Sequence, residues 1–158
     1  MSEIAWTSRQ LAQVAWQTGN PSKAEKLFRE SIRLLAPMKE RGTLCESQRL
    51  LAQLLLAEGR IDEAEKFALA ARETVSAEDV TSRATTRVAL AQVRAAQGRY
   101  EEADTLFAEA AEIIGSSEHC RILLDVLPPY ADFLRGLDRD AEAAELEARL
   151  AARVPAAA

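Results

Sequence analysis

The sequence predicts an all-α protein built from about four antiparallel helix hairpins, and three observations support this fold class. A glycine recurs every 38 to 40 residues, and an alanine follows each of these glycines by five positions. Between the glycines, apolar residues such as Leu50, Leu51, Leu54 and Leu55 recur at helical rather than alternating spacing. Repetition at this period is typical of a solenoid, in which each unit buries its apolar face against its neighbours. The glycines are Gly19, Gly59, Gly98 and Gly136, and the alanines are Ala24, Ala64, Ala103 and Ala141.

The composition agrees with one helical domain. The chain has 158 residues, the size of a single domain, and 48% of them are hydrophobic while only 5% are aromatic. Alanine, the best helix former and a poor strand former, is abundant. We therefore expect one repeat domain over residues 1–154, followed by a tail at 155–158. Its units are expected at about 2–37, 38–76, 77–115 and 116–154.

The net charge and the absence of targeting patterns in the sequence indicate which partners and which cellular location to expect for this protein. The formal net charge of −5 gives no electrostatic reason to expect nucleic acid or an anionic membrane surface as a partner. No stretch approaches the roughly 20 apolar residues of a membrane span, and the N-terminus lacks the pattern of a signal peptide. We therefore expect a cytoplasmic protein in which Cys45 and Cys120 are buried thiols, with a redox pair as the alternative.

Start and stop signals place the helices within the units. Asn20 followed by Pro21 predicts an N-cap and the first residue of a second helix. Thr43 and Glu46 have the spacing of a capping box, which predicts that a first helix begins there. Gly59 ends that helix, because glycine adopts the left-handed conformation without a Cβ penalty. Ser76 with Asp79, and Ser116 with Ser117, mark the first helices of the third and fourth units.

Two consecutive prolines interrupt the pattern in the fourth unit. When the units are aligned on Gly136, Pro128 and Pro129 stand where the other units have Leu-Ala. Proline inside a helix removes a backbone hydrogen bond and clashes with the preceding turn, at a cost of about 3 kcal/mol. We therefore expect a kink or a break near Leu127.

The repeated motif resembles the tetratricopeptide repeat family over nearly the whole chain. Three units read Leu-Ala-Gln before the glycine, at 11–13, 51–53 and 90–92, and the large residues Phe28 and Phe107 follow the alanine. The long units, with segments such as Gly-Arg-Tyr-Glu-Glu-Ala at 98–103, are similar to repeat arrays of bacterial signalling ATPases, transcription regulators and nucleotide cyclases. The resemblance implies a right-handed superhelix of helix hairpins whose first helices line a concave face.

Residues suited to catalysis are scarce. The one histidine, His119, adjoins Cys120, and neighbouring positions on a helix point about 100° apart rather than toward one ligand. The six glycines are all assigned to turns within or between units, so none remains for a phosphate-binding loop. The many carboxylates alternate with arginines and lysines, which is typical of a solvated helix face. We expect no catalytic residue, no metal site, no cofactor and no enzymatic activity.

Polar residues on the first helices form the candidate site. Positions ten and six before the glycine lie one turn apart and share a helix face. The residues that we expect to line a partner-binding groove are Arg9, Gln13, Arg49, Gln53, Gln92 and Tyr130. Arginine guanidinium groups with glutamine amides one turn further along the helix would suit an acidic or carboxylate-terminated peptide segment. Two alternatives remain open: a solvated wall without a ligand, and glutamines that only bridge neighbouring helices.

The function that these observations predict is a non-enzymatic scaffold for protein–protein interaction, as the regulatory part of a larger signalling protein. The alternative is a regulatory domain that responds to a small ligand, for which an enclosed pocket around Tyr130 and Phe133 would be the sign. Self-association through exposed solenoid ends is a further expectation, because Ile4 near one end and Leu146 and Leu150 near the other have no polar cap beyond them.

Overall fold

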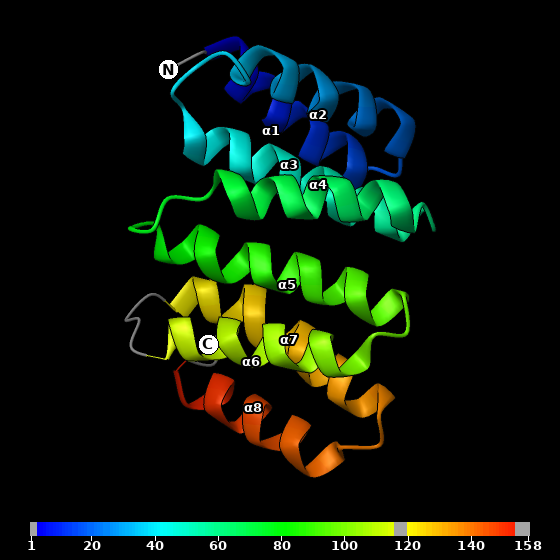
Figure 1. The fold of residues 1–158 in the computed structure, drawn as a ribbon, viewed down its shortest axis with the longest axis vertical. Helices are drawn as coiled ribbons and strands as arrows, with labels where there is room; N and C mark the ends of the chain where they lie inside the picture. Colours follow the sequence, from blue (N-terminus) through cyan, green and yellow to red (C-terminus); the bar gives the residue numbers. More distant parts are fainter. Residues whose placement is uncertain (1–2, 116–119, 154–158) are drawn as a thin grey trace. The chain divides into compact units, whose positions relative to one another are not determined.

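A computed structural model of the chain describes residues 3–115 and 120–153, and the described residues form eight α-helices and no strand (Figure 1). This confirms the predicted all-α fold class. The helices pair through short turns, and glycine or aspartate lies in each of the four turns inside a hairpin. Their bounds are α1 Glu3–Gln17, α2 Pro21–Leu35, α3 Arg41–Ala57, α4 Ile61–Thr74, α5 Val80–Ala96, α6 Tyr100–Ile114, α7 Cys120–Gly136 and α8 Asp140–Arg153.

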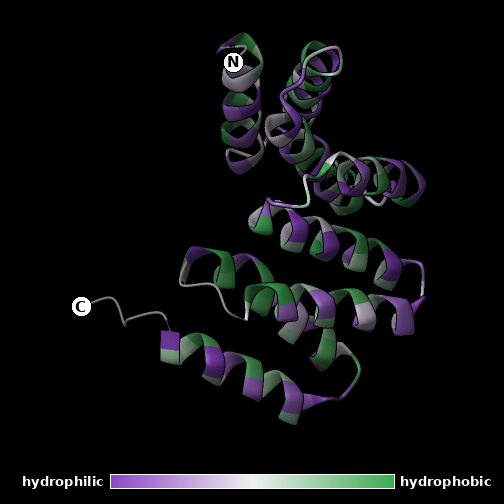
Figure 2. Cartoon of the chain, turned by 60° about the vertical axis from the view of Figure 1, so that its left-hand side comes forward, coloured by the Kyte–Doolittle hydropathy of each residue, from purple (hydrophilic) through white to green (hydrophobic). Residues whose placement is uncertain are grey.

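The chain divides into two compact units, Met1–Ser82 and Arg83–Ala158. In the first unit α1 packs on α2, α2 on α3 and α3 on α4. In the second unit α7 packs on both α6 and α8. Each helix carries apolar and polar stretches, as expected of helices that bury one face (Figure 2). The expected single domain over 1–154 stays a prediction.

Three of the four aligned glycines make the turns as predicted. Gly19, Gly59 and Gly98 have φ of +79°, +77° and +74°, the left-handed region in which glycine carries no steric penalty. The alanine five positions after each of them is fully buried in its hairpin. These alanines are Ala24, Ala64 and Ala103.

The predicted alignment of the fourth unit is wrong by two residues. Gly136 is the last residue of α7, and the left-handed turn lies at Asp138, with φ of +59°. Ala143, five positions after Asp138, is fully buried, whereas Ala141 is exposed. Aspartate is among the few residues other than glycine that tolerate this conformation, so a nearby glycine gave a false match. In the corrected register Tyr130 and Ala131 take the Leu-Ala positions of the other units.

The helix starts agree with the sequence at two of three positions. Asn20 caps α2, since its Oδ1 accepts a hydrogen bond of 3.2 Å from the Lys23 amide. Asp79 caps α5 in the same way, accepting from the Ser82 amide at 2.9 Å. The predicted start at Thr43 is wrong, because α3 begins at Arg41. The other expected helix start, Ser116 and Ser117, lies outside the described residues, as does His119.

Of the kink or break predicted near Leu127, the break is wrong, and the kink stays a prediction. The helix α7 runs without interruption from Cys120 to Gly136 and contains both Pro128 and Pro129. Proline fixes φ near −65°, close to the helical value, so two prolines can continue a helix although their nitrogens have no hydrogen to donate. The helix therefore tolerates the missing bonds and continues directly into Tyr130.

Candidate functional site

In the first compact unit, Arg9 and Arg49 each form a hydrogen bond with the glutamine that was predicted to lie beside it. The Arg9 Nη1 donates to Gln13 Oε1 at 3.2 Å on α1, and the Arg49 Nη1 donates to Gln53 Oε1 at 2.9 Å on α3. The two pairs form for the same reason, since residues four apart lie on one face of a helix. The same contact thus recurs on two neighbouring first helices.

The two arginines nevertheless differ in how many of their hydrogen-bond donors already have a partner. Arg49 also binds both carboxylate oxygens of Glu46, with Nη2–Oε1 at 2.6 Å and Nε–Oε2 at 3.1 Å, and its side chain is only 14% exposed. Trp6 stands at the corresponding position before Arg9. Within the described part of the chain, the Arg9 Nε is buried and has no hydrogen-bond partner. Arg9 is therefore the arginine with a donor still to satisfy. The ion pair between Glu46 and Arg49 could have been predicted from the sequence, because residues three apart lie on one face of a helix.

In the second unit Tyr130 belongs to an aromatic cluster. Its ring stacks on Phe107 at 5.2 Å with an interplanar angle of 6°, and Phe133 tilts against Phe107 at 5.1 Å. The Tyr130 hydroxyl donates to Asp104 Oδ1 at 2.8 Å. Burial, together with the neighbouring Asp104, raises the pKa of Tyr130 to about 12.

Placing Tyr130 in the groove depended on the Gly136 alignment, which the structure corrects. In the corrected register Asp132 takes the position of Gln13 and Gln53, and it is exposed on α7. Gln92 keeps its predicted position on α5, where it is half-buried. The row of glutamines therefore ends in a carboxylate.

A second recurring arrangement was missed at the sequence level. Arg60 follows the Gly59 turn directly and joins Glu25 of α2 at 2.8 Å to Glu63 of its own helix at 2.9 Å. Arg139 follows the Asp138 turn and likewise joins Asp104 of α6 at 2.6 Å to Glu142 at 2.7 Å. Both arginines connect the second helices of successive hairpins.

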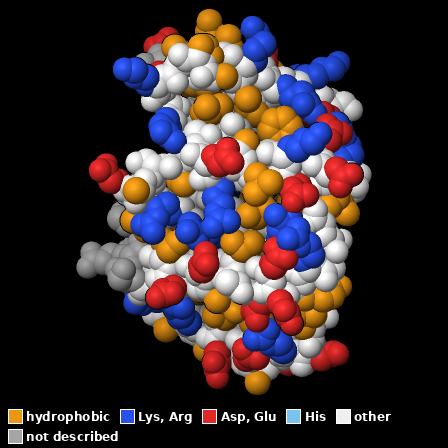
Figure 3. All heavy atoms as spheres, in the orientation of Figure 1, with side chains coloured by type: hydrophobic (Ala, Val, Ile, Leu, Met, Phe, Trp, Pro, Cys, Tyr) orange, Lys and Arg blue, Asp and Glu red, His pale blue; other side chains and the backbone are white. Residues whose placement is uncertain are grey.

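This arrangement sets the ionisation of the acids involved. The Arg60 guanidinium holds the pKa of Glu25 below its usual range, against the opposing effect of burial. Basic and acidic side chains are interspersed over the face drawn in Figure 3. The charged face was predicted to be merely solvated, whereas part of it holds successive hairpins together. The sequence signal was an arginine directly after the turn residue, at Arg60, Arg99 and Arg139.

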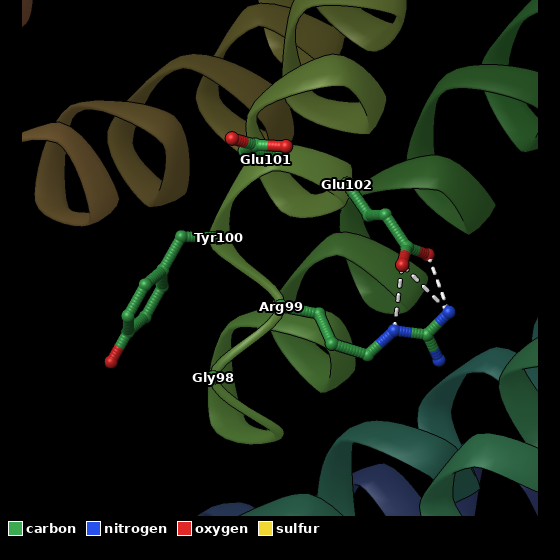
Figure 4. Close-up of a pocket in the computed structure, with 5 residues that line it drawn as sticks. All are labelled: Gly98, Arg99, Tyr100, Glu101 and Glu102. Carbon is green, nitrogen blue, oxygen red and sulfur yellow. Dashed lines mark hydrogen bonds and ion pairs between the residues drawn. The ribbon is translucent and has the colours of Figure 1, made fainter.

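A shallow hollow of about 380 Å³ lies at the start of α6 and is lined by Gly98, Arg99, Tyr100, Glu101 and Glu102. Arg99 donates to both oxygens of Glu102 at 2.7 Å, while Tyr100 points away from this pair (Figure 4). Arg99 and Glu102 thus bind each other rather than converging on a ligand. Tyr130 and Phe133, the residues expected around a ligand pocket, pack on Phe107 instead.

The described residues contain no group of three or more histidine, cysteine, aspartate or glutamate side chains placed to hold a metal ion. The described helices also include none that is long and apolar enough to cross a membrane. Cys45 is buried, with its Sγ donating to the Ala71 carbonyl at 3.3 Å, and burial raises the pKa of this thiol to about 11. The side chain of Cys120 lies outside the description.

Comparison with known proteins agrees with this geometry. One tetratricopeptide repeat family model matches residues 43–116, and another matches residues 5–30. No curated protein matches the sequence.

Solved structures share the fold. The chain is similar to the TPR-like repeats of a putative kinesin light chain from Podosopora anserina, at 23% identity over 96% of this chain and 76% of that one, with a TM-score of 0.69. It is similar to BtubC (BKLC) from P. vanneervenii at 21% identity over 98% of this chain and 72% of that one, with a TM-score of 0.72. The apo form of RapI matches at 14% identity over 95% of this chain and 56% of that one, with a TM-score of 0.77. Such identities show the fold alone, but with the two family matches they lead to one conclusion. The chain belongs to the tetratricopeptide repeat family.

Proposed function

We propose that this protein is a cytoplasmic, non-enzymatic interaction scaffold that binds a carboxylate-bearing segment of a partner protein on the first-helix face of its first unit. The observation that carries the proposal is the repeated arginine–glutamine pair, in which Gln13 is the one hydrogen-bond partner of the Arg9 guanidinium among the described residues. Guanidinium groups bind carboxylates through paired, charge-assisted hydrogen bonds, so an acidic acceptor is the natural complement.

The two arginines are proposed to play unequal parts. Arg9 is the anchor, because only Gln13 engages it within the described residues. Arg49 is held by Glu46, so a partner carboxylate has to compete with that side chain. Gln53 and Gln92 would supply amides beside an extended segment. The similarity of the long units to repeat arrays of bacterial signalling proteins supports a place for the chain as the regulatory part of a larger signalling protein.

The test uses a peptide array in which each acidic peptide is present with a free C-terminal carboxylate and with an amidated end. We expect the carboxylate forms to bind more tightly, with an affinity that falls as salt is added. Arg9→Ala should abolish this preference, whereas Arg33→Ala, at an exposed arginine of α2, should not. Glu46→Gln should strengthen binding by releasing Arg49.

Two outcomes would contradict the proposal. Binding that is equal for the carboxylate and amidated forms and that does not fall as salt is added would show that the site recognises no charged carboxylate. If Gln53→Ala lowered the free energy of unfolding but left peptide binding intact, the glutamines would serve packing between helices only.

A further inference from the structure

The helix α1 carries an apolar face that no described residue covers. Ile4, Leu11 and Val14 are 68%, 52% and 54% exposed. Their spacing of seven and three places them on one side of the helix, together with the exposed Thr7. Glu3 lies at the N-terminal edge of this side, and no charged residue lies on it between Ile4 and Val14. We call these four residues the α1 face.

The corresponding face is buried on α3. Counted from the turn residues Gly19 and Gly59, Leu11 corresponds to Leu51 and Val14 to Leu54. Both leucines are fully buried where α3 packs on α2. At the position of Thr7, Ser47 has its Oγ 3.0 Å from the Oγ of Ser31 in α2. The face on α3 is thus an interface for the second helix of the preceding hairpin.

In the second compact unit, the first helix α7 packs on the preceding second helix α6 through the corresponding face. Counted from Asp138, the residue at the Leu11 position is Tyr130, and its ring stacks on Phe107 of the preceding second helix α6. The α1 face is therefore a copy of an interface that exists twice in the described structure. Its shape and polarity are those of a surface that receives an amphipathic helix.

The described helices do not offer a matching free face. On α8, the residue at the position of the buried Phe28 and Phe107 is Glu147, whose carboxylate pairs with Arg135 at 2.6 Å. Burying such a pair against an apolar face carries a desolvation cost, which disfavours head-to-tail stacking of copies. Leu146 and Leu150 beside it are half-buried, and self-association through the ends of the repeat stays a prediction.

Pairing of two α1 faces is also disfavoured. The small residues of α1 that would allow close approach, such as Ala5, Ala12 and Ala15, are buried toward the hairpin. The face is only one helix wide, which is small beside the roughly 800 Å² per partner of a standard interface. A single docked helix fits such a patch better than a second copy.

We propose that the α1 face docks an amphipathic α-helix from a partner protein, with apolar, small and apolar side chains at the spacing of Phe28, Ser31 and Leu35 in α2. One feature of that helix follows from the turn residues. Arg60 and Arg139 each bind an acid three positions before the aromatic position of the preceding second helix, Glu25 or Asp104. In the first hairpin, α1 and α2, the residue after the turn is Asn20 rather than an arginine, and Asn20 caps α2. The docked helix therefore needs no acid three positions before its first apolar residue.

The probe is a synthetic peptide of residues 20–36, which contains the helix that covers this face on α3. We expect saturable binding to the full chain, measured by fluorescence anisotropy of the labelled peptide. Leu11→Glu should weaken binding at least about tenfold, as for the centre of a helix-docking site. Leu124→Glu is the control, because Leu124 is 50% exposed on α7 and lies outside the face. A Phe28→Ala peptide should bind weakly, whereas a Glu25→Gln peptide should bind as well as the original.

Three results would overturn the proposal. Unchanged affinity for Leu11→Glu would show that the peptide binds elsewhere, including by exchange with α2 itself. A Glu25→Gln peptide that failed to bind would show that the site requires the acid. Sedimentation that gave a dimer for the wild type and a monomer for Leu11→Glu would assign the face to a second copy. Because Arg9 lies on another side of α1, Arg9→Ala should leave binding of this peptide unchanged, so the docking face and the proposed groove can fail separately.

Discussion

Single residues in the left-handed conformation determine where each second helix begins. Gly19, Gly59, Gly98 and Asp138 all have positive φ, and the amide after each one bonds to the carbonyl five residues before it. The space around the glycines is open, since a Cβ added at Gly59 would meet no atom within 4 Å. Backbone conformation, not crowding, is therefore what requires glycine at these turns.

Alanine substitutions at two glycines separate these effects. Gly59→Ala should lower the free energy of unfolding by about 1–2 kcal/mol, because alanine is strained at φ of +77°. Gly42→Ala is the matched control, since Gly42 lies in α3 without positive φ and with equally open space. It should raise stability by about 0.5 kcal/mol, because alanine reduces the entropy of the unfolded chain. Urea denaturation measures both, and equal effects would contradict the conformational argument.

Tyr130 gives the stability a dependence on alkaline pH. Its pKa is about 12 in the folded protein, whereas an exposed tyrosine has a pKa near 10. The folded state thus holds the phenolic proton more tightly, and this contribution is complete below pH 10 and lost as the pH rises toward 12. Tyr130→Phe should be less stable by about 1 kcal/mol at neutral pH, through loss of the hydrogen bond to Asp104. The difference from the wild type should shrink between pH 10 and 12, and a constant difference would contradict the assignment.

At the scale of helices, the fourth hairpin shows how packing sets the register. The helix α8 buries Ala143 completely and leaves Ala141 exposed. Small residues at the buried position let the two helices of a hairpin approach closely. The position of the turn at Asp138 therefore decides which alanine of α8 faces α7.

Leucine substitutions at the two alanines test this register. Ala143→Leu should overpack the hairpin and cost about 1–3 kcal/mol of unfolding free energy. Ala141→Leu should change it by less than about 0.5 kcal/mol, because the side chain enters solvent. The denaturation midpoints of the two variants give the comparison. A larger loss for Ala141→Leu would restore the alignment on Gly136.

At the scale of the whole chain, the division between the two compact units falls inside the sequence of one helix. The division falls after Ser82, inside α5, which runs from Val80 to Ala96. Helix formation is cooperative along the chain, and repeat units depend on their neighbours for stability. If the chain is the single domain predicted from the sequence, the two units should unfold together.

The tryptophans allow this coupling to be measured, because Trp6 and Trp16 both lie in α1 and report on the first unit only. Far-ultraviolet circular dichroism reports on the helices of both units. We expect the two signals to give the same midpoint in urea denaturation. Two separate midpoints would show that the units unfold independently.

The sequence by itself determined the helical class, the hairpin spacing and three of the four turns. Glycine spacing and helical periodicity are local properties, and the local backbone conformation follows from them. The arginine–glutamine pairs of the candidate site were also predictable, because residues four apart must share a helix face. Other features depended on tertiary packing. Asp138 and Gly136 could each have made the last turn, and only the folded structure distinguishes them, through the positive φ of Asp138 and the burial of Ala143. The open apolar face of α1 likewise appears only when its equivalents on α3 and α7 are seen to be covered, because a sequence records which residues are apolar but not which of them find a partner.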